Sequence, residues 1–240
     1  MTCIVSAYYK IPSKQTHEWY MPHLIRWFRS VGTAPNVHFF TTEEIRDEIK
    51  TIVDTGAVVF HILPFNELTA LTRWGHEFWE RQYARDTERY HSPELGMIWY
   101  EKRHFVRRVM EIDCSKVFIW CDAGCVRDDA TEEKARTFGR RTTIRDDRIH
   151  LQRVMHQVFK QFYAHPDICV AGAILAGSKS AWTRYNVLYD RSLAEYDNAA
   201  VSGISDQYVT LRCVAHSPDA FMFHSEPSIV DPWFKFLELL

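Results

Sequence analysis

Short apolar runs alternate along this chain with longer segments in which apolar residues recur every three or four positions. A run of the first kind predicts a strand, and a segment of the second kind predicts an amphipathic helix. We expect strands at residues 3–9, 37–40, 57–64, 116–121, 167–177 and 220–224. We expect helices at residues 17–31, 68–90, 96–112, 151–164, 178–200 and 205–214, and one more after the capping sequence 41–44. This alternation favours an α/β fold of the Rossmann-like kind, with a mostly parallel central sheet flanked by helices.

Two segments differ from the rest of the pattern. Residues 117–121 are all apolar, which is typical of a central strand buried on both faces. Residues 128–148 are dense in charges and poor in large apolar groups, so we expect an exposed excursion or a loop beside the site. The chain shows no repeat and no linker, and its 240 residues fit one large domain, 1–240.

The charge balance argues against one class of partner. The chain has 29 basic and 31 acidic residues, with a formal net charge of −2. A protein without a general positive field does not attract a polyanion, so we expect no nucleic acid partner.

The apolar runs also bear on location. None is long enough to cross a bilayer, and the first six residues lack the basic and apolar regions of a signal peptide. We therefore expect a soluble, cytoplasmic protein without a transmembrane segment, and peripheral membrane association stays open. The six cysteines show no paired zinc-site spacing, and we interpret them as reduced core residues. They are Cys3, Cys114, Cys121, Cys125, Cys169 and Cys213.

The sharpest local feature is an apolar strand that ends in a carboxylate and a glycine, residues 118–124. In an open α/β sheet, ligands bind beyond the carboxyl ends of the strands, where Asp122 is expected. A carboxylate there supplies a hard oxygen ligand for a cation bound to a diphosphate, and Gly124 lets phosphates approach the backbone. From these residues alone, an Asp that merely begins a turn or caps a helix explains the motif equally well.

Four segments together resemble the HtrL/YibB family, which is regarded as glycosyltransferase-like. They are Ser-Pro followed by Ile-Trp and Lys in 92–102, the Trp-x-Asp-x-Gly motif in 118–124, the Gly-containing strand followed by Lys and Ala-Trp in 171–182, and Ser-Asp-Gln-Tyr at 205–208. The resemblance covers residues 92–214. It implies a GT-A-type, nucleotide-sugar-dependent glycosyltransferase, with a donor half at about 1–125 and an acceptor half at about 150–240.

The resemblance also implies a donor site. A tyrosine at the end of the first strand would stack on the nucleotide base, and two lysines would neutralise the diphosphate. A surface lysine or a core tyrosine is the alternative at each position. The implied donor-binding residues are Ala7, Tyr8, Tyr9, Lys10, Lys102, Asp122, Ala123, Gly124 and Lys179.

The catalytic and metal residues follow from the same resemblance. GT-A enzymes usually carry Asp-x-Asp where this chain has Asp-Ala-Gly. Asp122 would hold Mn²⁺ or Mg²⁺ with phosphate oxygens and a distant ligand such as His224, and the alternative is that Lys or Arg neutralises the diphosphate in place of a metal. Asp206 and Gln207 would lie on the acceptor side, where Asp206 acts as a general base or stabilises positive charge on the sugar. An N-cap at Ser205 or Asp206 and a structural histidine are the alternatives.

The function that these expectations describe is transfer of a hexosyl or related group. The donor would be a UDP- or GDP-sugar, and the acceptor a hydroxyl of a glycan or glycolipid. A non-catalytic carbohydrate- or nucleotide-binding module is the alternative. A methyltransferase is disfavoured because no Gly-x-Gly fingerprint follows the first strand.

Overall fold

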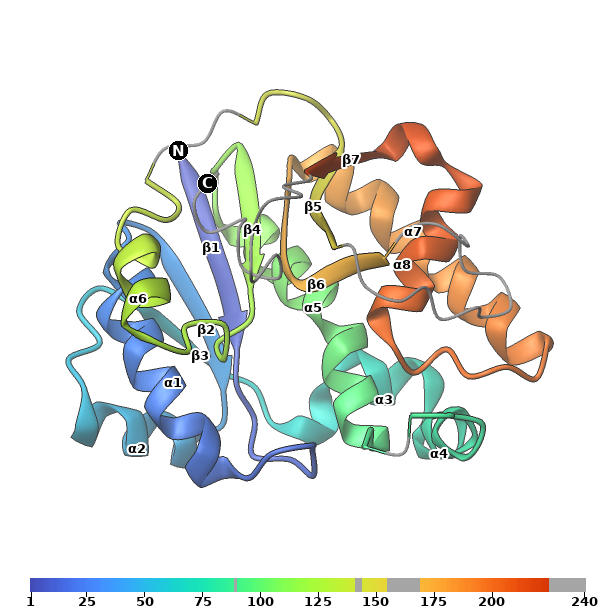
Figure 1. Ribbon diagram of the computed structural model, residues 1–240, viewed down its shortest axis with the longest axis horizontal. Coiled ribbons are helices and arrows are strands. Elements are labelled where there is room, and N and C mark those ends of the chain that lie inside the picture. Colours follow the sequence, from blue (N-terminus) through green and yellow to red (C-terminus); the bar gives the residue numbers. More distant parts are fainter. Residues whose placement is uncertain (89, 141–143, 155–168, 225–240) are drawn as a thin grey trace.

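The computed structural model describes residues 1–88, 90–140, 144–154 and 169–224 (Figure 1). Its strands are β1 (Thr2–Ala7), β2 (Val37–Thr41), β3 (Val59–Ile62), β4 (Val117–Cys121), β5 (Ile149–Val154), β6 (Cys169–Gly177) and β7 (Phe221–His224). Its α-helices are α1 (His17–Arg29), α2 (Glu43–Ile52), α3 (Thr69–Trp74), α4 (His76–Ala84), α5 (Pro93–Ile112), α6 (Asp129–Ala135), α7 (Lys179–Asn198) and α8 (Asp206–His216).

All these strands form one sheet, in the order β3-β2-β1-β4-β6-β5-β7. Strand β6 pairs antiparallel with both β4 and β5, whereas the other four pairings are parallel. Only β6 therefore runs against the common direction. This confirms the expected α/β class with a mostly parallel central sheet and flanking helices.

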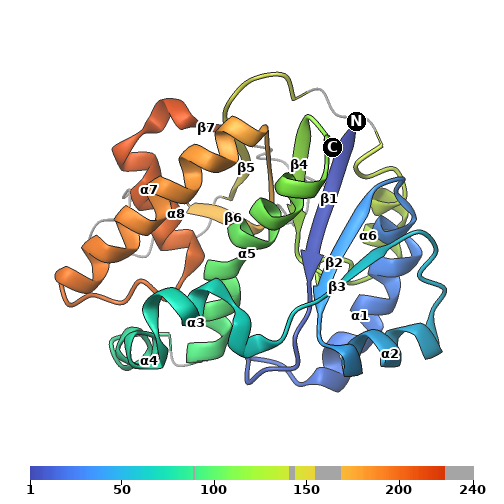
Figure 2. The same cartoon turned by 180° about the vertical axis from the view of Figure 1, so that it is seen from behind.

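The two faces of the sheet carry separate apolar cores. Side chains such as Ile4 and Phe39 pack against α1, α2 and α6 on one face. Side chains such as Val5 and Trp120 pack against the segment from α3 to α5 and against α7 and α8 on the other. The helices of the first face stand in front of the sheet in Figure 1, and those of the second are seen from behind in Figure 2. Strands buried on both faces explain the nearly continuous apolar runs in the sequence.

The connections place a topological switch point between β1 and β4. From β1 the chain passes through α1 to β2, and through α2 to β3, on one side of β1 and one face of the sheet. It then passes through α3, α4 and α5 on the other face to β4, on the opposite side of β1. A crevice opens beyond the carboxyl ends of two strands whose connections diverge in this way.

Three sequence expectations about elements need correction. The expected helix 68–90 is two helices, because Gly75 adopts φ +74° between α3 and α4, a conformation that ends a helix. Residues 151–154 of the expected helix 151–164 belong to β5, where they are largely buried, and 155–164 lie outside the described residues. The charged excursion 128–148 contains the short helix α6, which begins where the Asp128 side chain accepts a hydrogen bond from the Thr131 backbone N–H at 2.7 Å.

The cysteine interpretation is confirmed for most of the described cysteines. Cys3, Cys121, Cys125 and Cys213 are buried free thiols, whereas Cys114 is exposed. The side chain of Cys169 lies outside the described residues. Within the described part of the chain, none of the helices combines the length and the apolar character that crossing a bilayer requires.

Candidate active site

A cavity of about 480 Å³ lies beyond the carboxyl ends of β1 and β4, at the switch point. Its walls come from the end of β1, the start of α1, the first half of α5, the loop after β4, the middle of β6 and the start of α8. Ten of the residues expected from the sequence line it: Ala7, Tyr8, Tyr9, Lys10, Lys102, Asp122, Ala123, Gly124, Asp206 and Gln207. Elements from both ends of the chain therefore converge on one site.

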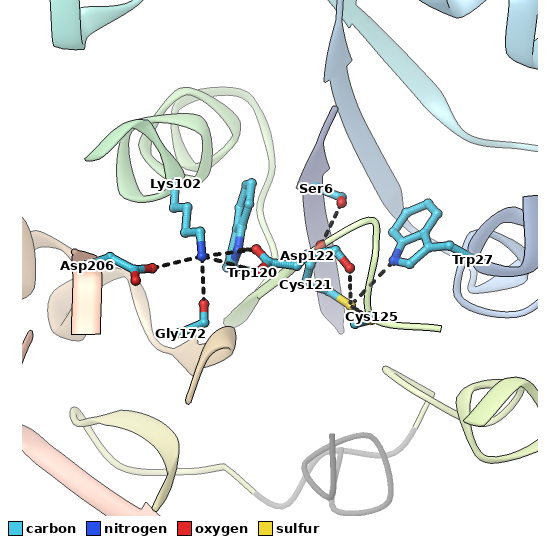
Figure 3. A network of polar contacts seen from close by, with 9 residues as sticks. All are labelled: Ser6, Trp27, Lys102, Trp120, Cys121, Asp122, Cys125, Gly172 and Asp206. Carbon is cyan, nitrogen blue, oxygen red and sulfur yellow. Dashed lines mark hydrogen bonds and ion pairs between the residues drawn. The ribbon is translucent and has the colours of Figure 1, made fainter. Parts of the chain in front are cut away.

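The ammonium of Lys102 is the hub of this site (Figure 3). Its Nζ lies 3.1 Å from Asp122 Oδ1, 2.8 Å from Asp206 Oδ2 and 2.9 Å from the Gly172 carbonyl oxygen. Lys102 is 5% exposed although it carries a full charge. Such burial is costly unless the charge is paired and hydrogen-bonded, and the two carboxylates and the carbonyl meet that requirement.

Asp122 is held in place from both its backbone and its side chain. Its backbone N–H donates to the Ala173 carbonyl at 2.8 Å, and the Trp120 Nε1–H donates to Asp122 Oδ1 at 2.7 Å. The Trp120 ring stacks on Phe105 of α5, with ring centroids 5.9 Å apart. The indole is thus fixed in the core while its N–H orients the carboxylate, which remains partly open to the cavity.

Asp206 is the first residue of α8, and Ser205 is the N-cap, whose side chain makes no capping hydrogen bond. The Asp206 carboxylate bonds to Lys102 across the site. It also explains a glycine in β6, because a Cβ on Gly172 would lie only 2.5 Å from Asp206 Oδ2. Neither residue acts as a side-chain helix cap: Ser205 makes no capping hydrogen bond, and Asp206 lies inside the helix.

Burial and charge act against each other at this site. Burial opposes the charge of Lys102, but the Asp122 and Asp206 carboxylates outweigh it and raise the lysine pKa. Burial raises the pKa of Asp122, the Lys102 ammonium opposes that shift, and the like charge of Asp206 adds to it. Two carboxylates share one ammonium, so the site carries a surplus negative charge when all three groups are ionised.

The end of β1 provides the aromatic wall of the cavity. The Tyr8 hydroxyl lies 2.9 Å from His17 Nδ1, and its ring centroid is 6.1 Å from that of Tyr20. Tyr9 is 5% exposed, donates to the Leu63 carbonyl at 3.0 Å and stacks on Phe105, so it is chiefly a core residue. Tyr8 and Tyr20 are the rings better placed to meet a ligand.

Two expected site residues lie elsewhere. Lys179 does not line the cavity, and its Nζ donates to the Met110 and Asp113 carbonyls, at 2.7 and 2.8 Å, at the carboxyl end of α5. Because β6 runs antiparallel to β4, its last residue, Gly177, pairs with Phe118 near the start of β4. Lys179 therefore lies near the amino-terminal end of β4, whereas the cavity lies beyond its carboxyl end. His224 lies on β7, which β6 and β5 separate from β4, and its Nε2 is 2.9 Å from His150 Nδ1.

The cavity also contains residues that the sequence reading missed. Among them are Tyr20, Trp99, Trp120 and the cations Lys14 and Arg127. Trp120 had a usable signal, because alternate residues of a strand point to one face and Trp120 therefore points the same way as Asp122. The others lie on α1, on α5 or in loops, and no local pattern distinguishes them from surface residues.

Comparison with known proteins identifies the family. Residues 75–240 match the model of a family described as a bacterial protein of unknown function (HtrL_YibB). The chain belongs to this family. The HtrL_YibB match confirms the resemblance seen in the sequence and extends it on both sides of residues 92–214. No curated protein matches the chain.

One solved structure similar to this HtrL_YibB chain is described as a crystal structure of a glycosyltransferase involved in the glycosylation of the major capsid of PBCV-1. The two chains are 10% identical, and the match has a TM-score of 0.45. It covers 99% of this chain and 88% of that chain.

Proposed function

We propose that this HtrL_YibB protein transfers a sugar, hexosyl or related, from a nucleoside-diphosphate sugar to a hydroxyl of a glycan or glycolipid. The observation that carries the proposal is the buried Lys102 ammonium between two carboxylates, Asp122 and Asp206, in a cavity at the switch point of the sheet. A structural ion pair can be fully enclosed. Charged groups that act on a substrate must instead line a cavity that the substrate can enter.

The donor would lie along the wall between β1 and β4. Tyr8 and Tyr20 offer rings for a uracil or guanine base, and Lys10, Lys14 and Arg127 offer positive charge for the diphosphate. The sugar would then extend toward Asp122, and the sugar hydroxyls would donate hydrogen bonds to the Asp122 carboxylate. Lys179 has no part in this arrangement, since it binds the end of α5.

The transfer step breaks the bond between the anomeric carbon and the diphosphate oxygen and forms a bond to the acceptor oxygen. Asp206 is proposed to take the acceptor proton at Oδ1, because Lys102 binds Oδ2. The surplus negative charge of Asp122 and Asp206 stabilises positive charge that develops on the sugar. Lys102 binds both carboxylates and fixes their separation. Gln207 lines the cavity next to Asp206, and its side chain would hydrogen-bond the acceptor.

The surplus negative charge and the partly exposed Asp122 carboxylate also fit a divalent cation, Mn²⁺ or Mg²⁺, that enters with the diphosphate. Such an ion would act as a Lewis acid on the leaving diphosphate. Asp122 would be its protein ligand. His224 does not fit this role, because it pairs with His150 and does not line the cavity.

A thermal-shift panel of UDP-, GDP- and CMP-sugars tests the proposal. A ligand that binds only the folded state stabilises it by about 2.7 kcal/mol at about 100 times its Kd, which raises the Tm. We expect one nucleotide class to raise the Tm of the wild-type protein and of Lys179→Met, but not of Lys102→Met. Repeating the panel with Mn²⁺ and with EDTA tests the cation, and an equal shift in EDTA would contradict it.

The same panel separates the proposal from its alternative. A donor that binds and is hydrolysed or transferred supports the glycosyltransferase. A donor that binds with no turnover toward water or any added glycan supports the non-catalytic module. If no nucleotide sugar shifts the Tm at any concentration, the proposed function is wrong.

A further inference from the structure

We propose that Cys3, His38 and Asp113 form a zinc site at the amino-terminal edge of the sheet, at the opposite end of β1 from the donor cavity. The three side chains bring one ligand atom each, a sulfur, a nitrogen and an oxygen, and these atoms lie within 4.8 Å of one another. The inference is independent of sugar transfer.

The fold itself brings the three residues together. In the parallel pairing of β1 and β2, His38 lies opposite Val5, so the His38 and Cys3 side chains point to the same face of the sheet. Helix α5 crosses that face and ends at its C-cap residue, Asp113. The residues are far apart in the sequence and show none of the short spacings typical of zinc motifs, so no sequence pattern reveals them.

The separation of two of the ligand atoms suits a shared ion better than a direct contact. His38 Nε2 and Asp113 Oδ2 are 3.9 Å apart, which is too far for a hydrogen bond. Two ligands bound tetrahedrally at about 2.1 Å from one zinc ion would be about 3.4 Å apart. An adjustment of about half an ångström would therefore bring these two ligand atoms to the separation of a tetrahedral pair.

The groups around the cluster have the arrangement that metal ligands usually need. The second ring nitrogen of His38, Nδ1, lies 2.8 Å from His61 Nε2, so its proton can sit there and leave Nε2 free for a metal. The Asp113 carboxylate accepts hydrogen bonds from Asn36 Nδ2 at 2.9 Å and from the Ser115 backbone N–H at 2.7 Å. Both ligands are thus oriented by neighbours that do not bind the ion.

The donor set and its charge select the ion. A thiolate, an imidazole and a carboxylate suit Zn²⁺, whereas Mg²⁺ and Ca²⁺ take oxygen ligands alone. Binding releases the thiol proton of Cys3, and the resulting thiolate and carboxylate balance the charge of one Zn²⁺. Cys3 and His38 are buried, but the Asp113 side chain is 17% exposed, so water can reach the cluster and would supply a fourth ligand.

Metal content and cobalt spectroscopy test the site without any activity assay. The full chain would be purified without a metal-affinity resin and analysed for zinc, with an expected stoichiometry near one per chain. Exchange with Co²⁺ should produce a thiolate-to-cobalt charge-transfer band. Both signals should be lost in Cys3→Ser and retained in Cys213→Ser, which alters another buried free thiol.

Asp113→Asn is the second variant, because it retains the size of the side chain and leaves the β1 core unchanged. We expect its affinity for zinc to fall at least tenfold while its circular dichroism stays native. A wild-type protein that contains no zinc and develops no cobalt band would overturn the site. So would a Cys3→Ser variant that keeps the band.

Discussion

Helix α5 carries two buried cations at successive positions, and they serve opposite purposes. Lys102 is 5% exposed and Arg103 is 1% exposed. Successive residues of an α-helix point about 100° apart, so the two side chains enter different surroundings. Lys102 enters the cavity wall beside Asp122 and Asp206, and Arg103 enters the packing between α5 and α7.

The partners of the two cations differ in kind. The Arg103 guanidinium lies 3.8 Å from the Tyr100 ring centroid and 4.1 Å from that of Tyr189, and it hydrogen-bonds the Asp190 carboxylate. Arg73 also binds Asp190, at 2.7 Å, so here the cations outnumber the carboxylates. At Lys102 the carboxylates outnumber the cation and face a cavity. Asp190 and Arg73 line a separate cavity of about 570 Å³, but Arg103 itself does not and is packed against two aromatic rings. That packing indicates a structural charge, whereas surplus negative charge on the wall of the switch-point cavity indicates a reactive site.

The largest expected effect is on turnover. Asp206→Asn should lower kcat about 10²–10⁴-fold, because the amide cannot take a proton from the acceptor. Its Tm and donor affinity should stay close to wild type, since the amide oxygen can still accept from Lys102. Kinetic assays with saturating donor measure the effect. Normal turnover with a lowered Tm would make Asp206 a structural partner like Asp190.

The next effect is on stability. Arg103→Met should cost about 3–5 kcal/mol of unfolding free energy, because it breaks a buried charge pair and removes the cation packed between the Tyr100 and Tyr189 rings, although Arg73 still binds Asp190. Lys102→Met should cost less, since its two carboxylates reach the open cavity and can be solvated there. Urea unfolding measures both. Arg107→Met, one turn further on α5 and exposed, is the control and should change stability little. Equal losses for Lys102→Met and Arg103→Met would remove the distinction between the two cations.

The Arg103 region should also respond to acid through His104. Burial, and then the charges of Arg103, Arg107, Arg73 and Arg108, lower the pKa of His104 to about 2. In the unfolded chain the pKa of this histidine is about 6.5, so His104 binds a proton there below that pH while it stays neutral in the folded chain. The free energy of unfolding therefore falls as the pH drops below about 6.5. At about 1.36 kcal/mol per pH unit, the loss from His104 by pH 5 is about 2 kcal/mol.

This acid sensitivity can be isolated by mutation. Unfolding free energies measured at pH 7.5 and pH 5 should differ less in His104→Phe than in the wild type. His76→Gln, an exposed histidine on α4, should behave as the wild type does. An unchanged acid loss in His104→Phe would mean that His104 is protonated in the folded protein.

The smallest effect is expected at Lys179. Its ammonium binds two carbonyls at the carboxyl end of α5, and a cation there is worth about 0.3–1 kcal/mol. Lys179→Met should lower the Tm slightly and leave donor binding unchanged. If calorimetry showed that Lys179→Met no longer binds the nucleotide sugar while its Tm is unchanged, Lys179 would be a donor-binding residue.

The sequence by itself determined the class of fold and the position of Asp122 at the carboxyl edge of the sheet. Apolar runs alternating with amphipathic segments are enough to predict an α/β sheet, because burial on both faces leaves a continuous apolar signature. The position of Asp122 after such a run places it at a ligand-binding edge without further information. Family resemblance, not periodicity, brought Lys102 and Asp206 to the same site.

Only the tertiary structure decided which polar residues meet. The antiparallel direction of β6 sends Lys179 to the far edge and brings Gly172, from the middle of the strand, to Lys102. The two strands between β4 and β7 keep His224 away from Asp122. The meeting of Cys3, His38 and Asp113 depends likewise on strand register and on where α5 ends. Strand direction, strand order and register arise from long-range packing, and no local stretch of sequence encodes them.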